Sequence, residues 1–262
     1  MSNTKSIDEK AVVHESARIA EDVEVGPFTI IGPDVEIGRG TVVGAMALVE
    51  RDTKVGEDCI IGHSAVIGTD PQDLKYHGEK THLVIGDRTT IREFATVNRA
   101  TVAEDGDATR VGSDTLIMAY AHVAHNCVVG DHVVITNAVN LAGHVCIEDY
   151  AIIGGMTAVQ QFVRIGAHSY VGGACRVTKD VPPYVKIGGV PTRPIEMNTI
   201  GLQRRGYSED SLNTLRKAYR FLYLSDLNTT QAVERIKAEL PVTDEIDRLV
   251  HFIESSTRGI IK

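Results

Sequence analysis

The feature that most constrains this chain is an aliphatic residue that recurs every six positions. Ile, Val or Leu stands at this interval over residues 13–67, again over 85–97, and then over 111–177. The position that follows is often Gly, as in "VGPFTI" and "IGPDVE". So strict a period over this length indicates a repeat architecture, because the strands of an ordinary β-sandwich do not keep it.

Six residues make one short strand and a bend. Side chains alternate along a strand, so the first and fifth residues of each hexad point inward. Gly or a small polar residue would supply the backbone conformations that the bends need. Three such sides close a coil of about eighteen residues, and coils stacked at about 4.8 Å share one aliphatic core. The sequence therefore predicts a mainly β protein built as a parallel β-helix.

Three of the four cysteines are expected in this core and not in a reactive site. Cys59, Cys127 and Cys175 each fall at a fifth, inward position, where a free thiol behaves as a small hydrophobe. No C-x-x-C pair occurs, so neither a disulfide framework nor a zinc ribbon is indicated.

The hexads are interrupted twice and then stop. We expect a β-helix over residues 1–195, with loops near 68–84 and 98–110, and a helical domain over 196–262. Pro182, Pro183 and a Gly pair end the hexads, and apolar residues at helical spacing follow. Loops on a rigid solenoid commonly carry binding function, although tolerated insertions would look the same.

Charge and hydropathy limit the possible partners and the compartment. A net charge of −8 argues against general nucleic-acid binding, so an acidic partner needs a local basic patch. No segment has the length and apolarity of a membrane span, and the first thirty residues lack a signal-peptide pattern. We expect a cytoplasmic protein.

Residues eighteen apart share a column of the coil, and several polar side chains then meet at one edge. They are His122, His125, Asn126, Asn140, His144 and Gln161. Exposed bends are often simply polar, but a cluster of this kind favours chemistry. Histidine is the natural general base near neutral pH, and the N–H of Gly143, one layer above His125, can stabilise an oxyanion.

A zinc site is the alternative for the same cluster. Parallel β-helices of the gamma-carbonic-anhydrase type hold zinc with three histidines shared between subunits, and His122, His125 and His144 could supply such ligands. Spacing alone does not decide between the two readings. If the chain were a non-catalytic scaffold, the alignment of these polar side chains and Gly143 in one column would have no explanation.

Eight motifs make a family resemblance specific, from about residue 12 onward. They are "PQDLKY", "IREFATVNR", "AHVAHNC", "LAGHV", "IIGGMTAVQQF", "DVPPY", "GLQRRGY" and "STRGIIK". With these motifs the chain resembles the bacterial acyl-ACP:UDP-N-acetylglucosamine O-acyltransferases, which begin lipid A biosynthesis. Hexads alone occur in many acyltransferases, whereas "QDLKY", "AHVAHNC" and "GLQRRG" together are specific.

The resemblance implies a homotrimer of left-handed β-helices with each active site between adjacent subunits. His125 would be the general base for attack by the glucosamine 3-hydroxyl on a (3R)-3-hydroxyacyl thioester. The Gly143 amide would hold the oxyanion. The donor would be the 4'-phosphopantetheine thioester of acyl carrier protein, with no bound cofactor, no metal and no acyl-enzyme.

The resemblance also implies the substrate contacts. Asp73, His122 and His144 would contact the sugar, assisted by Lys75, and Gln161 would be a further substrate contact. Asn198, Arg204 and Arg205 would bind the nucleotide, since guanidinium groups suit a diphosphate.

Three positions depart from the family pattern. Asn126 follows the base where an Asp is frequent, so an amide takes the place of a carboxylate as the orienter. An amide can orient an imidazole but stabilises an imidazolium ion less. Gln160 stands where a His is common, and Ile200 stands where some members carry an acidic contact to the uridine.

Two further sites concern the acyl donor. Gly173 occupies the position of the acyl-chain ruler, and its lack of a side chain suggests a longer acyl group. Arg216, Lys217 and Arg220 form a basic patch for the acidic carrier protein, or else an ordinary solvated helix face. An N-acyltransferase acting on a 3-amino UDP-sugar would share this whole site, so the sequence leaves it as an alternative.

Overall fold

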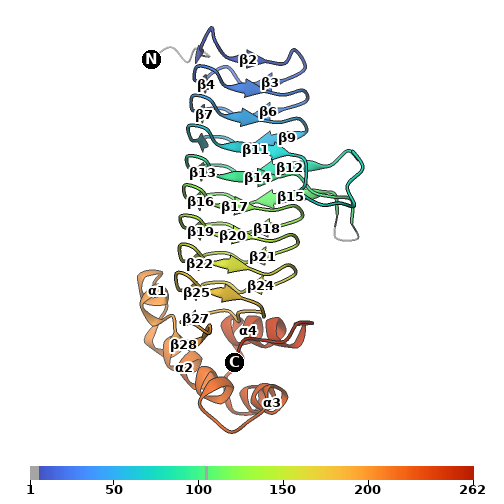
Figure 1. The fold of residues 1–262 in the computed structure, drawn as a ribbon. Helices are drawn as coiled ribbons and strands as arrows, with labels where there is room; N and C mark the ends of the chain where they lie inside the picture. The colour runs from blue at the N-terminus through green and yellow to red at the C-terminus, as the bar shows by residue number, and fades with distance from the viewer. Residues whose placement is uncertain (1–5, 104–105) are drawn as a thin grey trace.

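The computed structural model describes residues 6–103 and 106–262, so residues 1–5 of the expected β-helix and 104–105 of the expected second loop lie outside it. In the described part, short strands form three sheets along a prism (Figure 1). Sheet A contains β1 (Ser6–Ile7), β4 (Glu24–Val25), β7 (Val42–Val43), β10 (Ile60–Ile61), β13 (Thr90–Ile91), β16 (Leu116–Ile117), β19 (Val134–Ile135), β22 (Ile152–Ile153), β25 (Tyr170–Val171), β27 (Val185–Gly188) and β28 (Arg193–Met197).

The other two sides of the prism are built in the same way. Sheet B contains β2 (Val12–Val13), β5 (Ile30–Ile31), β8 (Leu48–Val49), β11 (Val66–Thr69), β14 (Thr96–Asn98), β17 (His122–Val123), β20 (Asn140–Leu141), β23 (Ala158–Val159) and β26 (Arg176–Val177). Sheet C contains β3 (Arg18–Ile19), β6 (Glu36–Ile37), β9 (Thr53–Val55), β12 (His82–Ile85), β15 (Ala108–Val111), β18 (Val128–Val129), β21 (Cys146–Ile147) and β24 (Arg164–Ile165).

The parallel pairing along the prism confirms the predicted parallel β-helix, and the coil is left-handed, as the resemblance implies. Val134 pairs in parallel with Leu116 on one side and with Ile152 on the other, so one coil takes eighteen residues. First and fifth positions of the hexads fill the core; Ile31 and Val35, for example, are 1% and 0% exposed. The cysteines at fifth positions are likewise buried and unpaired, as predicted.

The bends match the expectation in part, since small polar residues such as Asp34 and Ser64 have a positive φ there, but large residues have one as well. The fourth residue of most hexads has a positive φ, and it is usually not glycine; φ is 60° at Phe28 and 62° at Tyr120. Glycine at the second position serves close packing instead. A Cβ on Gly26 would lie 2.7 Å from the backbone nitrogen of Ala45 in the next coil. Glycine here permits the coils to stack.

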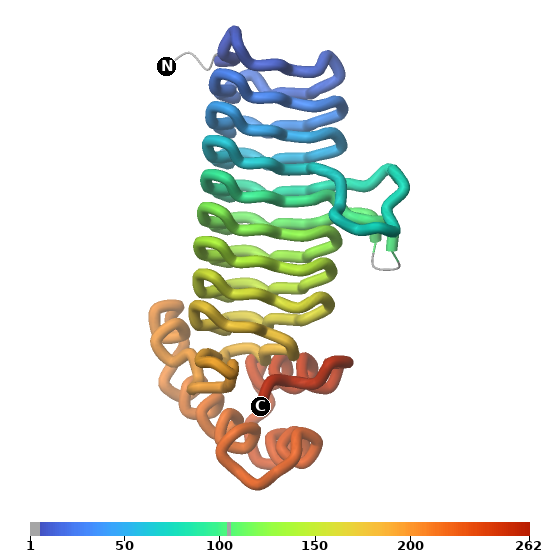
Figure 2. Tube along the Cα trace, in the orientation of Figure 1, coloured from blue at the N-terminus to red at the C-terminus, as the bar shows by residue number. Residues whose placement is uncertain are grey.

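Two segments leave the prism at the edge that sheets B and C share, which we call the B–C edge. One joins β11 to β12 and the other joins β14 to β15, and both project to the same side (Figures 1 and 2). Strand register is nevertheless kept, since Val55 pairs with Ile85 and Ile85 pairs with Val111. The added residues therefore bulge outward without disturbing the stack.

Four helices follow the last strand of the prism in the described chain. They are α1 (Thr199–Arg204), α2 (Glu209–Tyr223), α3 (Thr229–Glu239) and α4 (Asp244–Glu254). The side chains of Asn198, Ser208, Asn228 and Thr243 cap their N-termini. Ile260 then forms a bridge to Asp180, which closes the end of the prism (Figure 1). No described helix is long and apolar enough to cross a membrane.

Candidate active site

His125 and Asn126 form the bend between β17 and β18 on the B–C edge, and both are buried, at 7% and 4% exposure. The Asn126 Oδ1 accepts hydrogen bonds from the backbone N–H and the hydroxyl of Thr101, both at 2.9 Å. Its Nδ2 donates to the carbonyl oxygens of Thr101 and Gly106, at 3.0 and 3.5 Å. These four contacts fix the orientation of the amide.

That orientation decides the tautomer of the neighbouring imidazole. The Nδ1 of His125 lies 3.0 Å from the Asn126 Oδ1, which can only accept, so Nδ1 carries the proton. Nε2 then has a free lone pair. A Cβ at Gly143 would lie 2.6 Å from this Nε2, so only glycine fits at that position. A basic nitrogen therefore faces the backbone one layer away, as a general base requires.

Asp73 reaches the same nitrogen from the first projecting loop. Its Oδ2 lies 3.9 Å from the Nε2 of His125. Its Oδ1 accepts a hydrogen bond from the backbone N–H of Lys75 at 3.0 Å, and its carbonyl oxygen accepts one from Tyr76. The carboxylate is thus held in a turn. The side chain of Lys75 is exposed and points to no partner that the structure identifies.

Two further histidines flank His125. The Nδ1 of His122 lies 2.7 Å from the Thr96 hydroxyl oxygen, and burial, with a smaller effect of His125, lowers the pKa of His122. His122 is therefore neutral at pH 7 and suits a hydrogen-bonding role. The His144 ring meets His125 edge-on with centroids 5.3 Å apart, and it stacks on Phe162 at 4.6 Å.

These groups surround an open cavity of about 500 Å³. Its lining is Gln72, Asp73, His122, Ala124, His125, Asn140, Leu141, Ala142, Gly143, Ala158, Val159 and Gln161. The structure thus brings together the predicted base, the predicted oxyanion glycine and three of the predicted substrate contacts. Asn126 and His144 support the base from beside the cavity.

The predicted nucleotide contacts lie elsewhere on the chain. Asn198 and Arg204 line a hollow of about 320 Å³ against sheet A, together with Tyr170. Arg205 packs its guanidinium over the Tyr150 ring at 4.1 Å instead. Asn198 also caps α1 and donates to the His168 carbonyl at 2.8 Å, so it has a structural role as well. Within one chain, this hollow is separate from the cavity beside His125.

The two donor-side predictions fall on other surfaces. Gly173 lies exposed at the bend between β25 and β26, on the edge that sheets A and B share, and a Cβ there would lie 3.2 Å from the Gly155 carbonyl oxygen. Arg216, Lys217 and Arg220 line a hollow of about 650 Å³. Ile195 and Leu224, both exposed, contribute apolar surface to the same hollow.

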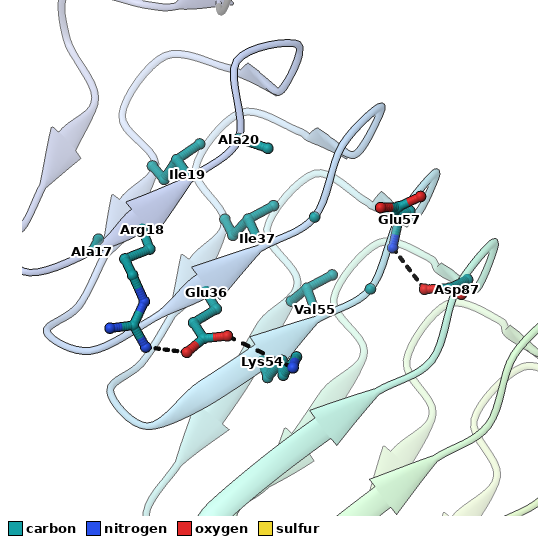
Figure 3. A pocket seen from close by; sticks show the side chains of 12 residues that line it. Ala17, Arg18, Ile19, Ala20, Glu36, Ile37, Lys54, Val55, Glu57 and Asp87 are labelled. Atoms are coloured by element: carbon teal, nitrogen blue, oxygen red, sulfur yellow. Dashed lines mark hydrogen bonds and ion pairs between the residues drawn. The ribbon is translucent and has the colours of Figure 1, made fainter.

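A larger hollow, of about 960 Å³, lies on sheet C toward the N-terminal end (Figure 3). Arg18 pairs with Glu36, and Glu36 also faces Lys54 at 3.8 Å, so the one carboxylate lies between two cations. Asp87 accepts a hydrogen bond from the Glu57 backbone N–H. The side chains that line this surface are occupied by their neighbours, and no catalytic arrangement results.

The zinc site that is the alternative for the histidine cluster would need at least three ligating side chains in a suitable arrangement. Within residues 6–103 and 106–262, no group of three His, Cys, Asp or Glu side chains has the arrangement of a metal site. Cys127 is not placed for covalent chemistry either. Its thiol is buried and donates to the Ala142 carbonyl at 3.2 Å, and burial raises its pKa to about 12.

Sequence reasoning missed the side chains that hold the site from the loops. Thr101, which clamps Asn126, and Gln72, which lines the cavity, both lie outside the hexads. The six-residue repeat predicts where residues within the coil lie, but not where residues of the projecting loops lie. Thr96, in contrast, is a strand residue whose pairing with His122 follows from register.

The fold and the site together define a bacterial hexapeptide transferase, the class whose six-repeat pattern residues 108–143 match. Residues 7–105 also match the GMPPB C-terminal domain, and residues 180–261 match domain 2 of UDP-N-acetylglucosamine O-acyltransferase. A protein of Ectopseudomonas mendocina named acyl-[acyl-carrier-protein]–UDP-N-acetylglucosamine O-acyltransferase is 50% identical, over 98% of this chain and 99% of its own length. The chain belongs to the acyl-[acyl-carrier-protein]–UDP-N-acetylglucosamine O-acyltransferase family.

Solved structures agree with this assignment. LpxA from Acinetobacter baumannii has a TM-score of 0.94 at 41% identity, covering 98% of this chain and 99% of that one. LpxA from Bacteroides fragilis, described as a UDP-N-acetylglucosamine acyltransferase, has a TM-score of 0.95 at 40% identity, covering 97% and 99%. The match extends over both the prism and the helices.

Proposed function

We propose that this chain transfers a (3R)-3-hydroxyacyl group from acyl carrier protein to the 3-hydroxyl of UDP-N-acetylglucosamine. The observation that carries the proposal is the His125 imidazole, whose Nδ1–H is fixed by Asn126 and whose Nε2 faces the cavity beside Gly143. Membership of the acyltransferase family supplies the two substrates.

The proposed reaction is a direct transfer. Nε2 of His125 takes the proton of the sugar 3-hydroxyl as its oxygen attacks the thioester carbonyl carbon. The tetrahedral oxyanion accepts a hydrogen bond from the Gly143 N–H. The C–S bond then breaks, and the departing phosphopantetheine thiolate takes the proton back from the imidazolium. Asp73, His122, His144 and Gln161 orient the sugar around the base.

The split between the His125 cavity and the Arg204 hollow supports a homotrimer. One UDP-sugar needs the base and the nucleotide contacts together, yet in one chain they lie at the B–C edge and against sheet A. In a threefold assembly the sheet A face of one subunit can approach the B–C edge of the next. Each site would then combine residues of two subunits.

An apolar stripe on the edge shared by sheets A and B also supports assembly. It contains Phe28, Met46, Phe94, Tyr120 and Met156, exposed at 56%, 55%, 46%, 63% and 74%. Sheet C instead carries paired charges on its outer face. A line of large apolar side chains in bends is unfavourable in water, so we propose that it is covered by neighbouring subunits.

We propose that the hollow lined by Arg216, Lys217 and Arg220 receives the acidic carrier protein. Changing Lys217 and Arg220 to Glu is expected to raise KM for acyl carrier protein about tenfold and to weaken its salt dependence. KM for the sugar nucleotide should stay near the wild-type value. The Arg235→Glu variant on α3 is the matched control, and an equal effect there would contradict the assignment.

The direct test is a transfer assay with purified protein, hydroxyacyl carrier proteins of several chain lengths and UDP-N-acetylglucosamine. We expect an O-acylated product, and a loss of turnover of about 10²-fold or more in His125→Ala. The 3-amino analogue of the sugar nucleotide serves as a competing acceptor. Near-full turnover in His125→Ala would refute the base, and product formed only from the amino sugar would refute the acceptor.

A further inference from the structure

Arg99 is a fully buried charged residue at the root of both projecting loops. Its side chain is 0% exposed, and its guanidinium pairs with Asp70 and donates to the Gly68 carbonyl oxygen. The Tyr76 hydroxyl lies 3.3 Å from the same guanidinium. Burying an arginine is costly unless its partners are well placed, so this site is built around the contacts that Arg99 makes.

The backbone beside Arg99 ties the two loops together. The Arg99 N–H donates to the Thr69 carbonyl oxygen at 2.9 Å. The Asn98 Nδ2 donates to the Thr69 hydroxyl at 2.8 Å and to the Asp70 carbonyl oxygen at 3.0 Å. Thr101, two residues further on, holds the Asn126 amide. One short segment therefore connects the first loop to the support of the base.

The contacts of Arg99 also close the first loop around Asp73. Asp70 and Tyr76 both reach the guanidinium, and the residues between them form the tip that enters the cavity. Pro71 within this tip is buried and has a fixed φ. The tip is thus a short closed segment, held at both ends by one side chain, that presents Asp73 3.9 Å from the His125 Nε2.

We propose that Arg99 is a positioning residue that sets the distance between Asp73 and His125 and so determines binding of the sugar acceptor. This inference rests on the proposed transfer to UDP-N-acetylglucosamine. Arg99 itself lies beneath the loops and does not line the cavity of the described chain. It acts through Asp70 and Tyr76 on the loop tip.

The chain offers a matched control in Arg51. It reaches the same Asp70 carboxylate at 3.5 Å and the same Tyr76 hydroxyl at 3.4 Å, but its side chain is 43% exposed. Because water competes for an exposed contact, its loss should matter little. Arg51→Gln is therefore expected to leave both KM values within about twofold of wild type.

The test compares steady-state kinetics of wild type, Arg99→Met, Arg99→Lys and Arg51→Gln. Arg99→Met should raise KM for UDP-N-acetylglucosamine about tenfold or more, the loss expected for one charge-assisted contact, with KM for acyl carrier protein nearly constant. Arg99→Lys keeps the charge but not the paired geometry and should fall between. Amide hydrogen exchange at residues 70–76 should quicken in Arg99→Lys while exchange in β17 and β20 is unchanged.

Two outcomes would overturn the inference. One is an equal rise of both KM values, which indicates general loosening, and the other is an Arg51→Gln effect as large as that of Arg99→Met. If Arg99→Met does not fold, the KM values of Arg99→Lys and Tyr76→Phe are compared with those of wild type and Arg51→Gln in its place. An inactive wild type would instead refute the proposed function, so the two failures are distinguishable.

Discussion

At the scale of single residues, the orienting group beside the base is an amide whose four hydrogen-bond contacts come from one loop. Thr101 and Gly106 present two donors to the Asn126 Oδ1 and two carbonyl acceptors to its Nδ2. A carboxylate has no donor for those carbonyl oxygens. The donors and acceptors of the second projecting loop therefore fit an amide at position 126 and do not fit a carboxylate.

The Asn126→Asp variant should consequently be less active and less stable than wild type. One carboxylate oxygen would face the Thr101 and Gly106 carbonyl oxygens, at a cost of about 1–3 kcal/mol. We expect kcat/KM to fall roughly tenfold and the melting temperature to drop. Asn228→Asp, at a helix cap where Asp serves equally well, is the control. Unchanged activity and melting in Asn126→Asp would show that the loop adapts.

Gly173 provides a second residue-scale prediction, on acyl length. A Cβ at this exposed bend meets only Gly155 within 4 Å, at 3.2 Å from its carbonyl oxygen and 3.8 Å from its nitrogen, so Gly173→Met should fold with a small local shift. The added side chain would shorten the space for the acyl group, and the preferred donor should become several carbons shorter. Competition between carrier proteins of different acyl length measures this. An unchanged preference would remove Gly173 as the ruler.

At the scale of elements, the hexads predicted the strands because each one repeats the same local balance of inward and outward residues. They also predicted the column that places Gly143 above His125, since a column follows from register alone. The short helix α1 and the β27–β28 hairpin were not predicted, because they have no repeat and few residues. The contacts of Thr101 and Arg99 depend on the backbone path of the loops, which the six-residue period does not determine.

The junction between the prism and the helices contains a buried histidine. His168 is 8% exposed, its Nε2 lies 3.1 Å from the Tyr207 hydroxyl, and its carbonyl oxygen accepts from Asn198. Burial first, and then the charges of Arg205 and Arg248, lower the pKa of His168 from 6.5 to about 4, while Asp149 opposes the shift. The junction is therefore built for a neutral ring.

Acid should loosen this junction. The unfolded chain binds the proton near pH 6.5 and the folded chain only near pH 4, so unfolding takes up a proton between these values. The free energy of unfolding should fall by about 2–3 kcal/mol as pH drops through this window, and the contribution is complete above it. Denaturant melts of wild type and His168→Gln at several pH values measure the slope, with exposed His251→Gln as control. An equal slope in all three proteins would contradict the assignment.

At the scale of the whole molecule, we propose that the site is complete only when two chains meet. His125 and Arg204 belong to different surfaces of one chain, and the apolar stripe runs along a third. The resemblance implies a site between adjacent subunits, and the structure adds which of its members lie on which surface of one chain.

Subunit complementation tests this division. His125→Ala and Arg204→Ala should each be nearly inactive alone, while every trimer that contains both variants should have one intact site of its three. Differently tagged subunits, co-expressed and purified through both tags, should therefore regain measurable turnover. Well-formed mixed trimers without activity would show that the two residues serve one site within a single chain, or different sites.

The two loops on the B–C edge have a consequence for how such an enzyme changes over evolution. A length change within a hexad would rotate every later side chain onto the wrong face, whereas Val55, Ile85 and Val111 keep their pairing despite the inserted residues. The edge that tolerates insertions is also the one that holds His125. New acceptor preferences can therefore arise by exchange of whole loops, with the folding unit inherited intact, and engineers can graft loops there by the same route.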